Sequence, residues 1–451
     1  MATKELTEGN PLKVITLFML PMFIGNVFQQ LYNFVDALVV GRYVGIEGLG
    51  AVGATMPMVF LIISFIFAST QGFSVVAAQK FGARDYQSLK KSAASSFILS
   101  GVITIVMTLI STPFTKQMLL IMNTPSDILP FAESYLFIMF GGIFATVYYN
   151  VASNLIRAVG DSKTPLFFLI ISSFFNIFLD ILFVKEFNWG IEGAAYATVA
   201  AQALSTVFCL IYMFIKFPVL RLKKEDWKVE PSFLYEHIKI GIPMGIQMSV
   251  LTIGILIVQY VLNGFGSIAV AAFTTAVRVD QIFSQSFIAL GASIATFTAQ
   301  NFGAGKISRI RKGARAGLII IAIICVFCFV VLKLFGSSIM SMFMNEPNEE
   351  IIRLGIIYLN IIVVYFVFLG LVLMYKNILQ GMGNSIVPLL SGVAELVARG
   401  VAALMLGKYL GYLGVCYATP LAWIVGMAVL YIGYKTDLKG KKSSLRLLKK
   451  S

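Results

Sequence analysis

The sequence has few charged residues. Only 12% of its 451 residues are Asp, Glu, Lys or Arg, and it contains a single histidine. Soluble domains usually contain roughly 25% charged residues, so the composition excludes an ordinary soluble globular protein. Hydrophobic residues make up 58% of the chain, and the mean hydropathy is +0.87. The chain is therefore predicted to be a polytopic membrane protein.

Motifs for catalysis or metal binding are equally scarce. All four cysteines fall inside apolar stretches, and the CxxC formed by Cys325 and Cys328 has no other metal ligand nearby. The patterns HExxH and GxSxG do not occur. These absences argue against an intramembrane enzyme, and we expect no cofactor and no resident metal. The first residues carry acids and lead into no small-residue cleavage pattern, so we expect no signal peptide.

Apolar runs long enough to cross a bilayer, which needs roughly 20 residues, recur along the whole chain. They predict an all-α membrane protein with twelve transmembrane helices. The expected spans lie at about 14–40, 49–76, 88–113, 131–156, 164–184, 190–215, 237–262, 268–298, 313–335, 353–380, 385–407 and 412–434.

The net charge of +14 is explained by membrane orientation, so no nucleic-acid partner is expected. Cytoplasmic loops accumulate Lys and Arg, and most of these residues fall in alternate loops, such as 216–239 and 435–450. This distribution predicts that both termini are cytoplasmic. We expect a multi-pass protein of a prokaryotic inner or plasma membrane.

An internal repeat divides the chain into two halves. Pro21 matches Pro243, and the matched residues lie 221 to 223 positions apart throughout. The other matches are AQKFGAR at 78–84 with AQNFGAG at 299–305, NTP at 123–125 with NEP at 345–347, NLIRAVGDSKTP at 154–165 with NILQGMGNSIVP at 377–388, and YAT at 196–198 with YAT at 417–419.

Six crossings per half is an even number, so the two halves enter the membrane in the same orientation. They should be related by a pseudo-two-fold axis along the membrane normal, as in transporters that rock one half against the other. The expected domains are an N-terminal lobe at 1–215, a cytoplasmic linker at 216–236, a C-terminal lobe at 237–436 and a basic cytoplasmic tail at 437–451.

A polar stripe in the first expected helix ends in an acid. Gln29, Tyr32 and Asn33 precede Asp36 by seven, four and three positions, so the four share one helical face. A carboxylate within a span costs about 2.5 to 3.5 kcal/mol on insertion scales and usually marks an ion route. The alternative is an acid that reaches the membrane surface near the helix end.

A second acid is expected at a similar depth. Asp36 and Asp180 each lie about 8 Å from the outer ends of their helices, and Thr198 lies about 9 Å down. Asn176 is one turn deeper than Asp180 on the same face. Two carboxylates in a low-dielectric site cannot both stay ionised cheaply, so the group should bind a proton or a hard cation such as Na⁺. A purely structural hydrogen-bond cluster is the alternative.

The repeat predicts that this acidic pair is confined to the first half, so a single coupling site is expected there. The counterpart of Asp36 is near Val258, and the counterparts of Asn176 and Asp180 are Arg399 and Ala403.

Five other charged residues are expected within the membrane in the second half. Lys376 is expected to extend its amino group toward the membrane surface, and the other four are Arg278, Asp280, Glu395 and Arg399. Asp280 and Arg278 are near the midplane, two positions apart, and so point away from each other. Glu395 and Arg399 are spaced i,i+4 and are expected to pair. We expect structural pairing for these four, with substrate electrostatics or gating as the alternative. His237, in the linker next to the membrane, is expected to be solvated.

The pattern VDALVVGRYVG, the AQKFGAR loop, RAVGDSKTP, the NxxxD at 176–180 and the duplication together resemble the MATE (multidrug and toxic compound extrusion) family over residues 10–436. Within it, the chain is most similar to the prokaryotic branch with DinF- and MepA-type exporters. The resemblance implies two six-helix lobes and maps the branch's cation site onto Asp36, Asn176, Asp180 and Thr198, with Tyr135 nearby. It also maps a bend in the first helix onto Pro21, where a proline removes a backbone hydrogen bond in any case.

The resemblance implies a secondary active antiporter that exports small cationic amphiphilic drugs in exchange for H⁺ or Na⁺, and we expect it to act as a monomer in the lipid bilayer. Candidates for the substrate cavity are Gln29, Tyr32, Asn33, Tyr148, Tyr149, Asn154, Met244, Met248, Arg278 and Asp280. A flippase for lipid-linked saccharides is the main rival, and a dense basic cavity would favour it. A major-facilitator carrier is disfavoured, because the loop at 78–92 lacks that family's GxxxDRxGRR pattern.

Overall fold

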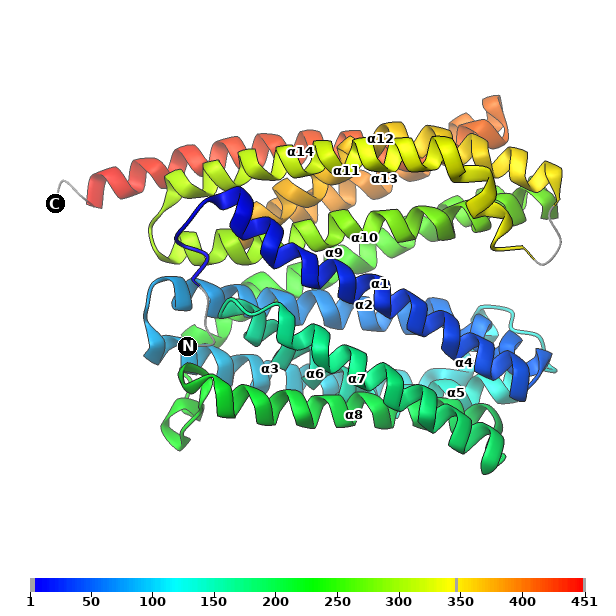
Figure 1. Ribbon diagram of the computed structural model, residues 1–451, viewed down its shortest axis with the longest axis horizontal. Coiled ribbons are helices and arrows are strands. Elements are labelled where there is room, and N and C mark those ends of the chain that lie inside the picture. Colours follow the sequence, from blue (N-terminus) through cyan, green and yellow to red (C-terminus); the bar gives the residue numbers. More distant parts are fainter. Residues whose placement is uncertain (1–4, 345–347, 449–451) are drawn as a thin grey trace. The chain divides into compact units, whose positions relative to one another are not determined.

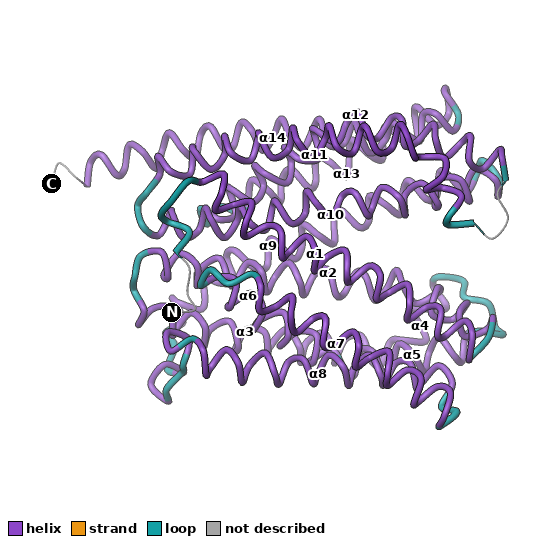
Figure 2. Tube along the Cα trace, viewed as in Figure 1, coloured by secondary structure: helices purple, strands orange, loops and turns teal. Residues whose placement is uncertain are grey.

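Helices dominate the protein. The computed structural model describes residues 5–344 and 348–448, and the side chains of these residues except 31–34, 36–38, 46 and 439–448. The described chain contains no β-strand (Figure 2). A bilayer favours this architecture, because lipid offers no partner for backbone N–H and C=O groups and a helix pairs them internally. The predicted all-α class is confirmed.

Eleven of the described helices are long and apolar enough to cross a membrane, and a bent pair supplies a twelfth span. The pair consists of α5 (Leu129–Gly141) and α6 (Ile143–Ala158), which meet at 44° around Gly142. It occupies the stretch for which one span, 131–156, is expected. The structure therefore agrees with the predicted count of twelve spans and adds a break in the fourth.

The helices form two compact units, which are described separately (Figure 1). Unit 1 contains Ile24–Gly245, and unit 2 contains Leu6–Phe23 together with the chain from Ile246 onward. Two helices are divided between the units, α1 (Pro11–Tyr43) and α9 (Pro231–Asn263). The others are α2 (Ile46–Gly82), α3 (Tyr86–Ser111), α4 (Thr115–Ile121), α5, α6, α7 (Lys163–Asp180) and α8 (Gly190–Lys216) in unit 1, and α10 (Ser267–Gly303), α11 (Ile307–Ser341), α12 (Glu349–Gly381), α13 (Ile386–Leu410) and α14 (Tyr412–Leu448) in unit 2.

Each divided helix contains a proline two residues before it passes between units. Pro21 precedes the division of α1 after Phe23, and Pro243 precedes the division of α9 after Gly245. A proline removes one helical hydrogen bond and is a common site of bending. The units thus differ from the expected lobe boundaries, because residues 11–23 of α1 belong to unit 2 and residues 231–245 of α9 belong to unit 1.

The internal repeat extends to the geometry of the helix starts. Helices α2 and α10 each contain 37 residues. Gly45 precedes α2 with a φ of 95°, and Gly266 precedes α10 with a φ of 87°. Glycine adopts this region far more readily than other residues do. Helices α2 and α10 therefore match with a spacing of 221 residues, the spacing seen between AQKFGAR and AQNFGAG.

Helices α2 and α9 cross at very close range in unit 1. A Cβ atom built on Gly72 would lie 2.5 Å from the Cα atom of Gly241, so the two glycines allow backbone to approach backbone. A Cβ atom on Gly245 would also come within 2.7 Å of the Phe65 ring. Small residues at such crossings are typical of membrane helices. This contact anchors the first turns of α9 in unit 1.

Candidate functional site

The candidate cation site lies where α7 turns back into α8. Helix α7 ends at Asp180 and continues as a π-helical turn, Ile181–Glu186. Positive φ angles at Asn188 and Gly190 reverse the chain, and α8 then runs back along α7. The helices are close here, because a Cβ atom on Gly193 would lie 3.1 Å from the carbonyl carbon of Phe183. This hairpin places Thr198 opposite Asn176.

Asn176 and Asp180 form the buried centre of this site. Their exposed fractions are 1% and 0%. With its nitrogen facing the carboxylate, the Asn176 amide donates to Asp180 Oδ2 over 2.8 Å and its oxygen accepts from the Thr198 backbone N–H over 3.2 Å. In the opposite orientation the nitrogen donates to Thr198 Oγ1 over 3.4 Å. The first orientation satisfies both ends of the amide, and amide orientation is assigned from such partners.

The other expected members of the site come from α5 and α1. Tyr135 is buried, with 7% of its surface exposed, on α5, and this helix packs against α8. Asp36 falls within α1, but its side chain lies outside the described residues, as do those of Tyr32 and Asn33. The structure therefore brings Asn176, Asp180 and Thr198 together and places Tyr135 on a neighbouring helix.

A small cavity of about 10 Å³ adjoins Thr198, with room for about one water molecule. Thr146 of α6 and Gln202 of α8 supply further polar groups to it. Neither residue is among the site residues predicted from the sequence, although Gln202 follows Thr198 at i,i+4 and so shares its face. The remaining lining residues are Val59, Ile63, Met139, Phe140, Gly142, Ile143 and Val199.

The oxygen atoms of the site suit a proton or a hard cation. A carboxylate and a hydroxyl are oxygen ligands that hard cations prefer, and a desolvated carboxylate gains from either a proton or a cation. Within the part of the chain that the structure describes, no group of three or more His, Cys, Asp and Glu side chains is placed to hold a metal ion.

The candidates for the substrate cavity are divided between the two units. In unit 1, Tyr148 stacks on Phe97 with ring centroids 6.2 Å apart, whereas Tyr149 donates to the carbonyl of Pro165 over 3.1 Å. Asn154 is buried and donates to Thr70 Oγ1 over 3.4 Å. The remaining candidates with described side chains are Gln29 and Met244 in unit 1, and Met248, Arg278 and Asp280 in unit 2.

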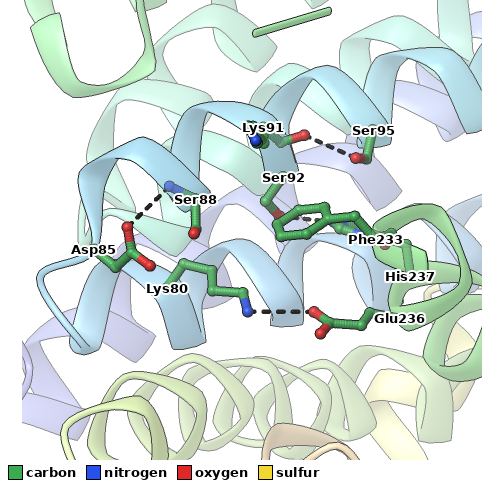
Figure 3. Close-up of polar contacts among 9 residues, drawn as sticks. All are labelled: Lys80, Asp85, Ser88, Lys91, Ser92, Ser95, Phe233, Glu236 and His237. Carbon is green, nitrogen blue, oxygen red and sulfur yellow. Dashed lines mark hydrogen bonds and ion pairs between the residues drawn. The ribbon is translucent and has the colours of Figure 1, made fainter. Parts of the chain in front are cut away.

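His237 is fully buried, so the expectation of a solvated histidine is wrong. Its Nε2 atom lies 2.7 Å from Ser92 Oγ, and its Nδ1 atom lies 2.9 Å from the carbonyl oxygen of Phe233 (Figure 3). The carbonyl can only accept, so Nδ1 donates to it and Nε2 accepts from the serine hydroxyl. Beside it, Lys80 and Glu236 form an ion pair of 3.3 Å. These contacts join α9 to α2 and α3 within unit 1.

Glu395 and Arg399 do not form the expected ion pair. Glu395 accepts from Ser391 Oγ over 3.2 Å, and Arg399 donates to the carbonyl of Leu251 over 3.5 Å. Among the described residues, the ion pairs within 4 Å do not include these two side chains. Glu395 packs over Gly426 of α14 instead, and interhelical packing overrides the helical spacing.

The fold and the buried polar group define a polytopic helical membrane protein that is built from a duplicated six-helix unit, with a buried carboxylate and a buried amide next to a hydroxyl group in unit 1. The MatE family matches residues 21–182 and 243–404, one segment in each half of the repeat. The chain therefore belongs to the MatE family, as its motifs predict.

Curated relatives match almost the whole chain. The chain is 28% identical over 440 residues to the probable multidrug resistance protein YpnP of Bacillus subtilis strain 168, which covers 96% of this chain and 97% of that protein. It is 24% identical over 443 residues to the multidrug export protein MepA of Staphylococcus haemolyticus, with 97% of each chain covered. The predicted MepA-like branch fits these relatives.

Solved structures share the fold. A structure described as the outward-facing conformation of a multidrug resistance MATE family transporter of the MOP superfamily matches with a TM-score of 0.91 and 24% identity. A MOP superfamily transporter from Pyrococcus furiosus matches with a TM-score of 0.90 and 23% identity. Each match covers 97% of this chain and 98% of the solved chain.

Proposed function

We propose that this protein is a secondary active efflux antiporter that exports cationic amphiphilic drugs in exchange for H⁺ or Na⁺. The observation that carries the proposal is the complete burial of Asp180 in a membrane-spanning unit, where Asn176 links it to α8. An intramembrane carboxylate is costly to keep and usually marks an ion pathway. Drug export is supported by membership of the MatE family and by the relatives, which are named as multidrug resistance and multidrug export proteins.

In this proposal Asp36 joins Asp180, Asn176 and Thr198 as the coupling site, with Tyr135 nearby. A proton or cation bound there removes the charge of a carboxylate that is otherwise poorly solvated. A ligand shifts a conformational equilibrium only through different affinities for the two states. The carboxylates must therefore be solvated differently when the site faces the two sides of the membrane.

Helix α1 is the element that transmits this change in the proposal. Its residues before Ile24 pack in unit 2 and its residues from Ile24 onward pack in unit 1. Pro21 removes a helical hydrogen bond close to the point of division. Bending at Pro21 would therefore change the path of a helix that carries Asp36 and belongs to both units.

The rival function, a flippase for lipid-linked saccharides, requires cations that are free to hold a diphosphate. Two of the three expected intramembrane cations, Lys376 and Arg399, interact electrostatically with Glu395, and the third is Arg278. A carboxylate placed between two cations offsets part of the field that a diphosphate would need. This arrangement favours drug export over the flippase.

The proposal is tested with ethidium in inverted membrane vesicles, with a pH gradient or a sodium gradient imposed separately. We expect one of the two gradients to drive ethidium accumulation by the unaltered protein. Asp36→Asn and Asp180→Asn should each abolish this accumulation, while purified protein still binds ethidium. Glu192→Gln, which changes an exposed carboxylate at the start of α8, is the matched control and should leave accumulation unchanged.

Two results would overturn the proposal. The first is normal gradient-driven accumulation in both Asp36→Asn and Asp180→Asn, which would show that these residues do not form the coupling site. The second is the absence of ethidium movement under either gradient in vesicles where the unaltered protein is folded and abundant.

A further inference from the structure

Unit 2 contains a buried carboxylate that the coupling site of unit 1 does not use. Asp280 lies in α10 with 9% of its surface exposed. Its Oδ1 atom accepts from Ser284 Oγ over 3.0 Å, and its Oδ2 atom accepts from the Tyr358 hydroxyl over 3.2 Å. The Phe273 ring packs on Tyr358 with centroids 4.8 Å apart, so an apolar wall adjoins the site. The carboxylate is thus held by two neutral hydroxyls.

The charged and titratable groups around Asp280 do not neutralise it. Cys328 of α11 interacts with Asp280 itself. Around Tyr358 lie Tyr412 and Cys416 of α14 and Arg399 of α13. Arg399 donates to a backbone carbonyl, and Arg278, two residues before Asp280, is exposed. Among the described residues, no ion pair within 4 Å includes Asp280.

A buried carboxylate in such surroundings is stabilised by taking up a proton. Desolvation penalises its charged form, and two hydrogen bonds from neutral hydroxyls offset the penalty only in part. A hydroxyl can accept as well as donate. Ser284 and Tyr358 can therefore hold the carboxyl group in its protonated and its deprotonated form without moving.

The internal repeat shows which residues of unit 1 correspond to Asp280 and to its partner Ser284. With the spacing of 221 residues that relates α10 to α2, Asp280 and Ser284 correspond to Val59 and Ile63. Both of these residues line the small cavity beside Thr198 in unit 1. Unit 2 therefore has a carboxylate and a hydroxyl where the wall of the unit 1 cavity is apolar.

Tyr358 on α12, whose hydroxyl donates to Asp280, also has a counterpart in unit 1. Tyr135 and Leu136 of α5 correspond to Tyr358 and Leu359, with the spacing of 223 residues seen between NLIRAVG and NILQGMG. The position of Asp180 is taken in unit 2 by Ala403. Each unit thus contains the repeated tyrosine and a buried carboxylate, which lies on α7 in unit 1 and on α10 in unit 2.

We propose that Asp280 is a second proton-binding site, held by Tyr358 and Ser284, so that each unit carries a carboxylate that gains and loses a proton during transport. The role of Asp280 in transport rests on the proposed antiport function. The proton-binding site itself does not depend on that function, and it can be detected without transport.

The direct test is infrared difference spectroscopy of the purified, detergent-solubilised protein between high and low pH. We expect a C=O stretching band of a buried protonated carboxyl that disappears in Asp280→Asn. Tyr358→Phe keeps the carboxyl group but removes one hydrogen bond, so the band should remain and shift in frequency. Glu192→Gln, at an exposed carboxylate, should leave this band unchanged. An Asp280→Asn spectrum identical to that of the unaltered protein would overturn the proposal.

The transport test uses proteoliposomes with a pH gradient, no membrane potential and ethidium as the probe. Exchange of two protons per ethidium allows accumulation of about 100-fold per pH unit, and exchange of one proton allows about tenfold. We expect Asp280→Asn to lower the limit from the first value toward the second, and an unchanged limit would overturn the role in transport. If neither a pH nor a sodium gradient moves ethidium in the unaltered protein, the proposed function fails, while the infrared result still decides whether Asp280 binds a proton.

If Asp280→Asn does not fold, the infrared band of Tyr358→Phe decides the assignment. A shifted band supports proton binding at Asp280, and an unshifted band overturns it.

Discussion

Nε2 of His237 and Oγ of Ser92 lie 2.7 Å apart, so a single buried hydrogen bond ties α9 to α3 within unit 1. Ser92→Ala removes the donor and leaves Nε2 buried without a partner, which costs about 1 to 3 kcal/mol. We expect a lower apparent melting temperature for purified Ser92→Ala. Ser95→Ala is the control, because Ser95 bonds to the Lys91 carbonyl of its own helix. An equal drop in melting temperature in Ser92→Ala and Ser95→Ala would contradict the assigned role of His237.

The crossing of α2 and α9 predicts opposite effects for two glycine substitutions in one helix. A Cβ atom at Gly72 would meet the Gly241 backbone at 2.5 Å, whereas a Cβ atom at Gly53 has nothing within 4 Å. Gly72→Ala should destabilise the protein by at least about 1 to 3 kcal/mol. Gly53→Ala should stabilise it by up to about 1 kcal/mol, because alanine is the better helix former. Thermal unfolding of both variants in the same detergent checks these predictions, because the melting temperature should fall for Gly72→Ala and rise for Gly53→Ala.

The break between α5 and α6 predicts a compensating pair of substitutions. A Cβ atom at Gly142 would lie 2.5 Å from Val199 Cγ1, next to Thr198. Gly142→Ala should therefore lower both stability and coupled efflux, because Val199 must move toward the site. Val199→Ala makes room, so the double variant should recover most of the loss in a double-mutant cycle. If the losses of stability and of coupled efflux in the two single variants simply add in the double variant, the two positions do not interact.

The Asn176 amide predicts a coupling defect without loss of the fold. Asn176→Ala removes the donor to Asp180 Oδ2, and a hydrogen bond to a charged group contributes about 1.5 to 3 kcal/mol. Since 1.4 kcal/mol corresponds to a factor of ten, gradient-driven ethidium efflux should fall about tenfold or more. Gln259→Ala, which removes an exposed amide bonded to Asn263, should keep normal efflux. Parallel melting curves separate coupling from folding.

Asp85 predicts a pH-dependent contribution to stability. Its carboxylate caps α3 by accepting from the Ser88 backbone N–H over 3.0 Å, and this bond lowers the pKa of Asp85 below its ordinary value of 3.8. A lowered pKa means that the contribution is fully present above the unfolded-state value and disappears as the pH falls through the folded-state value. Asp85→Ala should cost about 1 kcal/mol at neutral pH. The difference in melting temperature from the unaltered protein should shrink steadily below about pH 4.

The sequence by itself determined the class of the protein. Long apolar stretches can satisfy their backbone in lipid only as helices, so hydropathy predicted an all-helical membrane protein. The repeat, read from short matches such as AQKFGAR and AQNFGAG, predicted the duplication because related residues keep a constant spacing. Helical periodicity also predicted that Asn176 and Asp180 share a face, since residues four apart are neighbours on any helix.

Tertiary structure decided the contacts between helices, because which faces meet depends on packing partners far away in the chain. It buried His237 against Ser92 of α3, although the histidine directly follows what reads as a polar linker. It left Glu395 and Arg399 without a direct ion pair despite their favourable spacing, since Ser391 and the Leu251 carbonyl supply hydrogen-bond partners. It also joined Asp280 to Tyr358, 78 positions away in the chain, which no local pattern predicts.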